Sequence, residues 1–288
     1  MRIAAVAPLV AVLLAGSLST SVPPAGAEVA GVAAVTAAAL PSFDHIVVVV
    51  EENHSYPEVI GAPGAPYLTS LAASGANLVQ SYGVTHPSQP NYLALFSGSV
   101  QGVVSDSCPH TFTADNLGHQ VLASGQTFAG YSEGMPSVGY TGCTSGRYAR
   151  KHNPWVDFAD VPAAANLRFA DFPAAYASLP RVSFVVPDLC DDMHDCAVST
   201  GDTWLRTNLA GYATWAATHD SLLLVTFDED DSSAGNRIPT VFSGAHVAPG
   251  TYTEGVDHYT VLRTLEDLTG LACLATACSR TPIGDIWN

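Results

Sequence analysis

The chain of 288 residues carries 10 basic residues (Lys and Arg) against 26 acidic ones (Asp and Glu), which gives a formal net charge of −16 at pH 7. A surface this acidic repels nucleic acid and anionic membranes at long range, so the composition argues against nucleic acid as a partner. The length is ample for a buried core, and no internal repeat divides the chain.

The N-terminal segment has the pattern of an export signal. Arg2 is followed by the apolar stretch "IAAVAPLVAVLLAG" and then by "AGA", a small-residue cleavage sequence. We therefore predict a signal peptide over residues 1–27, an Ala/Val-rich stretch over 28–40 and a single domain over 41–288. No later apolar run approaches the roughly 18 residues that a membrane span needs. The expected product is a secreted protein without a transmembrane segment.

Four short apolar runs punctuate the chain at residues 45–50, 127–131, 181–186 and 221–227. Each run ends in polar residues, and helix-like stretches follow. This alternation predicts an α/β fold in which a largely parallel central sheet is sandwiched by helices. In such sheets a ligand binds beyond the carboxyl ends of the strands.

Polar clusters follow three of these predicted strands. Glu51, Glu52 and Asn53 come after the first strand, and acidic residues fill 188–195 and 228–231. Acidic residues after strands are often only helix caps and first-turn anions, which would explain one or two of them. Three clusters at one rim instead favour a divalent cation, which is Ca²⁺, Mg²⁺ or Mn²⁺ with oxygen ligands, or Zn²⁺ if histidines join.

Ser88 lies in "THPSQPNYLALFSG" between two prolines, just ahead of an apolar run. A helix beginning near Pro90 or Asn91 would point its free amides at the hydroxyl and favour an alkoxide there. Beside a cation, Ser88 would be a nucleophile. The alternative, that Ser88 only caps the helix, stays open. No G-x-S-x-G elbow or nucleotide-binding glycine loop is present.

Six cysteines in an exported chain indicate disulfides. Cys190 with Cys196 and Cys273 with Cys278 are near neighbours, which leaves Cys108 for Cys143, although the sequence alone permits other pairings.

Several segments together resemble one known family. They are, in order, "VVVVEENHSY", "THPSQPNYLALFSG", "RKHNPWVDF", "VVPDLCDDMHD", "GDTWL", "VTFDEDD" and "HYTVLRTLEDLTGL". The sequence resembles the bacterial phosphoesterase family of acid phosphatases and phospholipases C, within the alkaline-phosphatase-like superfamily. The resemblance covers about residues 40–288.

The resemblance implies a role for each matching residue. Ser88 would be the nucleophile, Asn91 would contact a phosphoryl oxygen, and His152 and His194 would hold the phosphoryl group, one of them protonating the leaving group. One divalent metal ion would be bound by the family's ligand positions, which are Glu52, Asn53, Ser88, Asp228 and Glu229.

A second metal is a further possibility that the resemblance raises. Two-metal relatives have a histidine where this chain has Glu229, which favours a single ion. Asp188, His194 and His258 would form the second site. His258 has the simpler alternative of capping the helix that follows it, and His86 that of packing the turn before Ser88.

Three basic residues in "RYARKH" stand directly before His152. Arg147, Arg150 and Lys151 either form a solubilising loop or attract an anionic substrate to the site.

The predicted function is a secreted, metal-dependent phosphoric monoester hydrolase with a phosphoserine intermediate. Its substrate would be a phosphorylated small molecule or a phosphoinositide, and an acidic pH optimum follows if the histidines are protonated in mild acid. The alternatives are a phospholipase C or other phosphodiesterase, and a secreted cation-binding protein with an inactive site.

Overall fold

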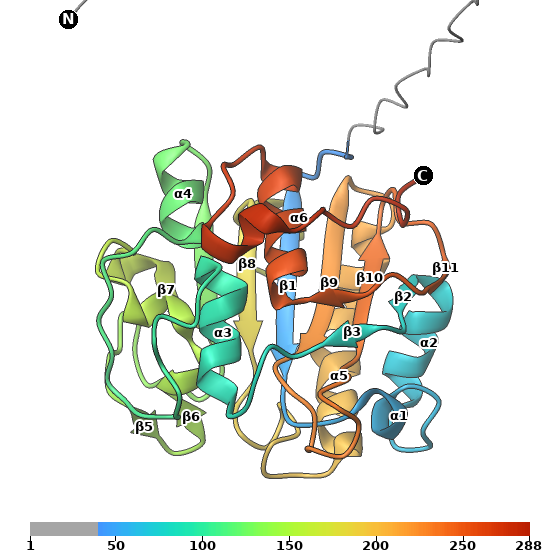
Figure 1. The fold of residues 1–288 in the computed structure, drawn as a ribbon, viewed down its shortest axis with the longest axis horizontal. Coiled ribbons are helices and arrows are strands. Elements are labelled where there is room, and N and C mark those ends of the chain that lie inside the picture. The colour runs from blue at the N-terminus through green and yellow to red at the C-terminus, as the bar shows by residue number, and fades with distance from the viewer. Residues whose placement is uncertain (1–39) are drawn as a thin grey trace, which may run out of the picture. The chain divides into compact units, whose positions relative to one another are not determined.

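The computed structural model describes residues 40–288 (Figure 1). The predicted signal peptide and nearly all of the Ala/Val-rich stretch lie outside the described residues.

The helices and strands alternate along most of the chain. The strands are β1 (His45–Glu51), β2 (Ala76–Leu78), β3 (Ser81–Tyr82), β4 (Phe128–Ser132), β5 (Thr144–Ser145), β6 (Tyr148–Ala149), β7 (Asn166–Arg168), β8 (Val182–Val186), β9 (Ser221–Phe227), β10 (Thr240–Gly244), β11 (Gly250–Tyr252) and β12 (Val256–Asp257). The α-helices are α1 (Tyr56–Val59), α2 (Pro66–Ser74), α3 (Ser88–Ser97), α4 (Leu117–Ala123), α5 (Val198–Ala216) and α6 (His258–Thr269). Short 3₁₀ helices, among them η1 (Arg150–His152), connect several of these elements.

The central sheet has eight strands in the order β11-β2-β10-β9-β1-β8-β4-β7. β1 runs parallel to β8 and β9, and β4 runs parallel to β8 and β7. Only β10 is antiparallel to its two neighbours, β9 and β2. The prediction of a largely parallel sheet is confirmed, and the four predicted strands correspond to β1, β4, β8 and β9.

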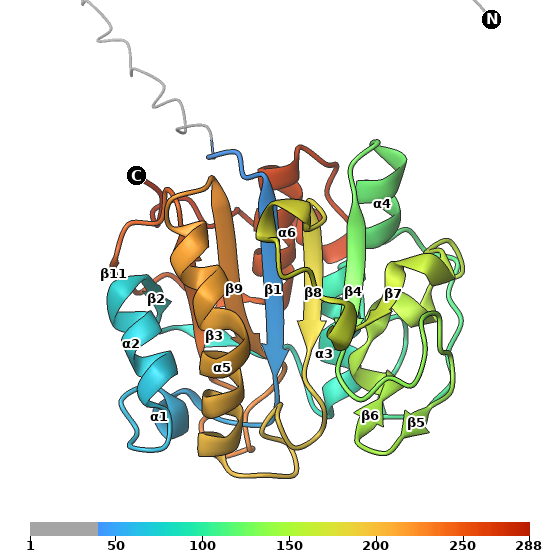
Figure 2. The same cartoon turned by 180° about the vertical axis from the view of Figure 1, so that it is seen from behind.

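Alternating side chains of the strands pack into two separate cores. In β1, Ile46, Val48 and Val50 face α3, α4 and α6, whereas Val47 and Val49 face α2 and α5. The first group of helices covers the face seen in Figure 1, and the second covers the face seen in Figure 2. A strand that is buried on both faces reads as a continuous apolar run, as "HIVVVV" does.

All three disulfides pair as the spacing suggested, joining Cys108 to Cys143, Cys190 to Cys196 and Cys273 to Cys278. Within residues 40–288, no helix is long and apolar enough to cross a membrane.

Candidate active site

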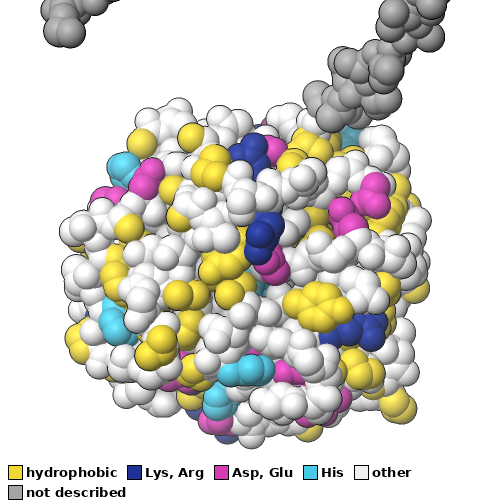
Figure 3. Space-filling view, viewed as in Figure 1, with side chains coloured by type: hydrophobic (Ala, Val, Ile, Leu, Met, Phe, Trp, Pro, Cys, Tyr) yellow, Lys and Arg dark blue, Asp and Glu magenta, His cyan; other side chains and the backbone are white. Residues whose placement is uncertain are grey.

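The candidate site lies where the parallel strands end. Glu52 directly follows β1, and Asp228 and Glu229 directly follow β9, the neighbouring strand. The first residue of α3, Ser88, reaches this edge from the face of the sheet that α3 covers. In the space-filling view, acidic and histidine side chains gather at the lower edge of the molecule, where these strands end in Figure 1 (Figure 3).

The Ser88 hydroxyl points at two carboxyl groups. Its Oγ donates to Glu52 Oε2 at 3.1 Å and to Glu229 Oε1 at 3.3 Å, and the side chain is 1% exposed. The helix starts at Ser88 itself, two residues before the predicted start, and Pro87 occupies the N-cap position without a side-chain cap. The capping interpretation is therefore wrong for Ser88. The hydroxyl instead lies between the carboxyl groups of Glu52 and Glu229.

Two further side chains, those of Tyr92 and His152, contact Glu52. Tyr92, one helical turn after Ser88, donates its hydroxyl to Glu52 Oε1. His152 Nε2 lies 3.1 Å from the same oxygen, and His152 Nδ1 lies 3.3 Å from Asp192 Oδ2. The imidazole of His152 stacks on the Tyr92 ring with 5.1 Å between the ring centroids. Glu52, His152 and Asp192 each offer a ligand atom within 4.8 Å of the others.

Burial and mutual repulsion dominate the electrostatics of this cluster. Burial, then the nearby Asp228, raises the pKa of Glu52 well above its usual 4.5. Burial, then Glu229, raises the pKa of Asp228 from 3.8 to about 7, and burial raises that of Glu229 from 4.5 to about 7. The Lys151 charge lowers the pKa values of Glu52 and Glu229 and so offsets only part of this effect.

The site has the properties of a binding site for a divalent cation. Asp228 Oδ2 is buried without a hydrogen-bond partner among the described residues, and the buried Asp192 Oδ2 and His152 Nε2 have only ion-pair contacts, at 3.3 Å to His152 Nδ1 and 3.1 Å to Glu52 Oε1. Orphaned buried polar atoms are rare in folded proteins, and a cation would satisfy both the lone pairs and the repulsion. A buried group of Glu52, His152 and Asp192 could thus hold a metal ion, as the prediction of a metal site requires, but of the predicted ligands this group contains only Glu52.

Some predicted site residues have other partners in the structure. The Asn91 amide donates to the carbonyl oxygens of Thr85 and Pro87, and its Oδ1 accepts from Val84 and Thr85. Asn91 therefore holds the loop before Ser88, and its contact with a phosphoryl oxygen stays a prediction. The Asn53 backbone N–H donates to Asp228 Oδ1 at 3.1 Å.

The predicted second metal site is not assembled. His258 is not the helix cap either, since Asp257 accepts from the Thr260 N–H in that role. Instead His258 Nε2 donates to the carbonyl oxygen of Asp228 at 2.6 Å, and it thereby buttresses the loop that carries the acidic residues. His194 pairs with the adjacent Asp195.

Asp188, the third predicted ligand of that second site, lies with Glu133 and Asp191. Among residues 40–288, no group of potential ligands contains Asp188, His194 and His258 together. Sequence spacing could not reveal this, because His258 lies in a different segment from Asp188 and His194, and the path of the loop after β8 separates the latter two.

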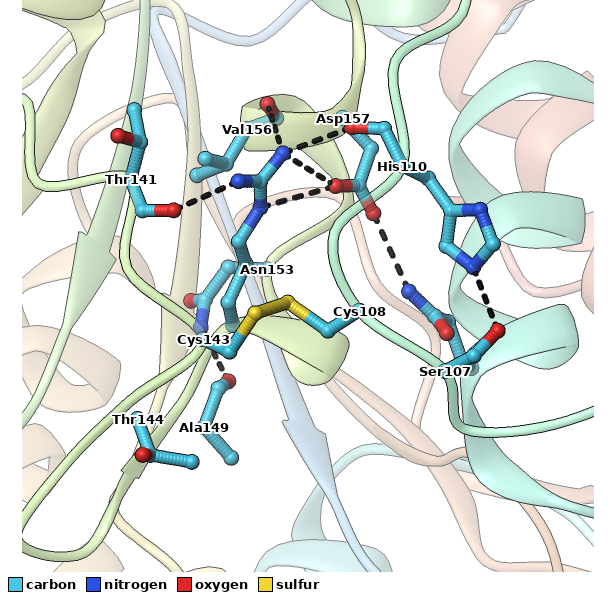
Figure 4. The surroundings of a disulfide bond; sticks show 12 residues. Ser107, Cys108, His110, Thr141, Cys143, Thr144, Ala149, Asn153, Val156 and Asp157 are labelled. Carbon is cyan, nitrogen blue, oxygen red and sulfur yellow. Dashed lines mark hydrogen bonds and ion pairs between the residues drawn. A yellow bond between two sulfur atoms is a disulfide. The ribbon is translucent and has the colours of Figure 1, made fainter.

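The basic residues of "RYARKH" separate into different roles. Arg150 is 6% exposed and pairs with Asp157, with guanidinium to carboxylate distances of 2.9 and 3.0 Å. It also donates to the carbonyl oxygens of Thr141, His110 and Val156, beside the disulfide of Cys108 and Cys143 (Figure 4). The expectation that Arg150 steers substrate is wrong, because its charge is buried and fully paired.

Lys151 is partly buried, whereas Arg147 is exposed. Lys151 Nζ lies 2.7 Å from Asp106, and its charge also acts on Glu52, Asp228 and Glu229. Arg147 is exposed and acts on Asp191. Of these three basic residues, only Lys151 acts electrostatically on Glu52 and Glu229.

Three residues of the site escaped the sequence interpretation as functional residues. Tyr92 follows Ser88 by four residues on the same helical face, a spacing that could have revealed it. Asp192 was one of five acidic or histidine positions in 188–195 and gave no signal of its own. His86, expected only to pack the turn, places its Nδ1 2.7 Å from Glu229 Oε2 and is partly exposed.

The chain belongs to the Phosphoesterase family, whose model matches residues 62–272. It is 51% identical over 257 residues to "Phosphatidylinositol-3-phosphatase" of Mycobacterium tuberculosis, covering 88% of this chain and 86% of that protein. It is 30% identical to "Phosphate-repressible acid phosphatase" of Penicillium chrysogenum, covering 91% of this chain and 69% of that protein.

The fold agrees with this assignment. A protein of the alkaline phosphatase superfamily from Vibrio parahaemolyticus superposes with a TM-score of 0.58 at 14% identity, over 84% of this chain and 71% of that one. The alkaline-phosphatase-like fold predicted from the sequence is thereby confirmed.

Proposed function

We propose that this phosphatase is a secreted, metal-dependent phosphomonoesterase in which Ser88 is the nucleophile. The observation that carries the proposal is the position of the Ser88 hydroxyl between the carboxyl groups of Glu52 and Glu229, at the first residue of α3. A hydroxyl at this place has a proton acceptor on two sides and the positive end of a helix dipole beneath it.

One divalent cation fits the site, and the residues placed to hold it are the oxygen and nitrogen donors already described, which are Glu52, Ser88, His152, Asp192, Asp228 and Glu229. When bound, such a cation acts as a Lewis acid and lowers the pKa of a coordinated hydroxyl.

Residues of the chain transfer the protons and stabilise the charge that the reaction requires. A carboxylate, Glu52 or Glu229, accepts the Ser88 proton as the Ser88 oxygen bonds to phosphorus and the bond from phosphorus to the leaving oxygen breaks. In the first turn of α3 the Gln89 N–H is already donated to Asp106 Oδ1 and Pro90 has no N–H, so the Ser88 N–H at the positive end of the helix stabilises negative charge on the phosphoryl oxygens. His86 is exposed enough to donate a proton to the leaving oxygen. Water then hydrolyses the phosphoserine and regenerates the hydroxyl.

His152 does not fit the role of a protonated acid in mild acid. Burial, followed by the charges of Lys151 and His194, lowers its pKa well below 6.5. His152 is therefore neutral there and acts as a partner of Glu52 and Asp192. An acidic pH optimum is proposed from the relatives named acid phosphatases, and this buried histidine lends it no support.

Phosphatidylinositol 3-phosphate is the proposed substrate, because the mycobacterial relative of 51% identity is named for it. The charge of Lys151 acts on Glu52 and Glu229, and it would also attract the phosphorylated headgroup.

The test compares hydrolysis of p-nitrophenyl phosphate by the wild type and Ser88→Ala, each with and without a chelator. We expect kcat to fall at least about 10³-fold in the variant and activity to disappear on chelation. Ser74→Ala, at an exposed serine of α2, is the matched control. Activity that survives Ser88→Ala would overturn the nucleophile assignment, and faster cleavage of bis(p-nitrophenyl) phosphate would overturn the monoesterase assignment.

A further inference from the structure

A carboxylate of the chain itself lies beside Ser88, at the start of α3. Asp106 Oδ1 accepts from the Gln89 N–H at 3.0 Å, and Asp106 Oδ2 lies 2.7 Å from Lys151 Nζ. The Asp106 side chain is 30% exposed, so it is in contact with solvent, whereas Ser88 is buried. This carboxylate thus joins the first turn of α3 to η1.

The two donors that this carboxylate engages are donors that an anion at the nucleophile would use. The Gln89 N–H directly follows Ser88 at the positive end of α3, and the next residue, Pro90, has no N–H. The charge of Lys151 acts on Glu229, one of the two carboxyl groups beside the Ser88 hydroxyl. Amides at a helix N-terminus and lysine ammonium groups are both common partners of phosphate groups in proteins.

The negative charge of Asp106 acts on the candidate active site. Burial raises the pKa of Glu229 to about 7, and the charge of Asp106 is the next largest contribution in that direction. Because Glu229 accepts from the Ser88 hydroxyl, the same charge also acts on a phosphoryl group bound at Ser88. A phosphomonoester carries nearly two negative charges at neutral pH, so the carboxylate repels it.

Asp106 reaches the site from an exposed loop. Ser105 and Ser107 on either side of it are exposed, and their hydroxyl groups bond to one another at 3.1 Å. The disulfide of Cys108 and Cys143 fastens the loop just beyond Ser107 (Figure 4). Rotation about the side-chain bonds of Asp106 therefore frees both donors while the loop itself stays fastened.

We propose that Asp106 is a specificity-determining residue that competes with the phosphoryl group for the Gln89 N–H and for Lys151. The inference rests on the proposed function, which places the phosphoryl group at Ser88. Binding of the phosphoryl group displaces the carboxylate from the two donors, and release of phosphate restores both contacts. Asp106 therefore weakens the binding of a phosphomonoester and of inorganic phosphate. It weakens the binding of a phosphodiester less, because a diester carries only a single charge.

The test measures binding of inorganic phosphate at neutral pH by isothermal titration calorimetry, with the full chain carrying Ser88→Ala as the parent protein. Binding to this parent requires no catalysis, so the result is separate from the test of the proposed function. Adding Asp106→Asn removes the charge but keeps an oxygen that can accept from the Gln89 N–H. We expect this variant to bind phosphate at least about fivefold more tightly than the parent. The gain should be smaller for dimethyl phosphate, which carries a single charge.

The matched control is Asp171→Asn, because Asp171 is 31% exposed and pairs with Arg168 at the same distance of 2.7 Å. It should leave phosphate binding unchanged. Asp106→Ser is a second neutral variant, and circular dichroism shows which of the two is folded. Unchanged or weaker phosphate binding in a folded neutral variant would mean that Asp106 only holds Lys151 in place. That result, or a parent protein that binds no phosphate, would overturn the proposal.

Discussion

At the scale of single residues, the candidate site depends on contacts between side chains that are far apart in the sequence. Ser88 meets Glu52 and Glu229, and Glu52 in turn meets His152, whose other ring nitrogen faces Asp192. These contacts link Ser88, through Glu52 and His152, to Asp192. In the proposed mechanism Asp192 would orient His152.

Asp192→Asn should lower kcat about 10- to 100-fold with a smaller effect on KM, because the amide no longer fixes the orientation of His152 as a carboxylate does. Steady-state kinetics on p-nitrophenyl phosphate check this. Asp44→Asn, at an exposed aspartate just before β1, serves as control. If Asp192→Asn raised only KM, the residue would belong to substrate binding.

At the scale of elements, η1 shows how adjacent residues acquire opposite roles. Arg150 turns inward to Asp157 and several carbonyl oxygens, Lys151 turns to the surface, and His152 turns into the site. The tight turn of a 3₁₀ helix distributes successive side chains around its axis. The motif "RYARKH" thus combines a structural ion pair, a surface charge and a site residue.

Replacing the two basic residues of η1 separately should give different defects. Arg150→Met is expected to lower the free energy of unfolding by about 3–5 kcal/mol, since it leaves Asp157 buried and unpaired. Lys151→Met should leave stability nearly unchanged and raise KM severalfold for an anionic substrate. Urea unfolding and steady-state kinetics of both variants distinguish these effects. A KM unaffected by Lys151→Met would exclude it from substrate attraction.

At the scale of the whole molecule, the edge of the sheet concentrates carboxylates on both faces. β1 delivers Glu51 to the α5 face and Glu52 to the α3 face, simply because consecutive side chains point in opposite directions. The carboxylates at this edge repel one another, and a bound cation would reduce that repulsion.

The stability of the metal-free protein should therefore fall as the pH rises. The folded protein keeps protons on Asp228 and Glu229 up to about pH 7, whereas the unfolded chain releases them near pH 4. Below pH 4 these two groups are protonated in both states and cost no stability. As the pH rises from 4 through 7, they lower the free energy of unfolding by about 2–4 kcal/mol.

Thermal unfolding in a chelator between pH 4 and 8 measures this loss. A divalent cation binds the ionised carboxylates, so its stabilising effect should be larger at pH 8 than at pH 5. Asp228→Asn is expected to flatten the pH dependence. Stability that increases from pH 5 to 8 in the chelated protein would contradict this electrostatic picture.

The sequence by itself determined the alternation of strands and helices, since strands buried on both faces must be continuously apolar and their carboxyl ends must meet at one edge. For the same reason it placed the acidic clusters after the strands at one edge, while the resemblance to the phosphoesterase family indicated Glu52, Ser88, Asp228 and Glu229 as residues of one site. Only the tertiary structure decided that Asp192 and Tyr92 join that site, that Arg150 is buried, and that Asp188 lies with Glu133 on the opposite face. The physical reason is that local patterns define which edge and face a residue occupies, whereas partners across the sheet depend on strand order and loop paths, which no short pattern encodes.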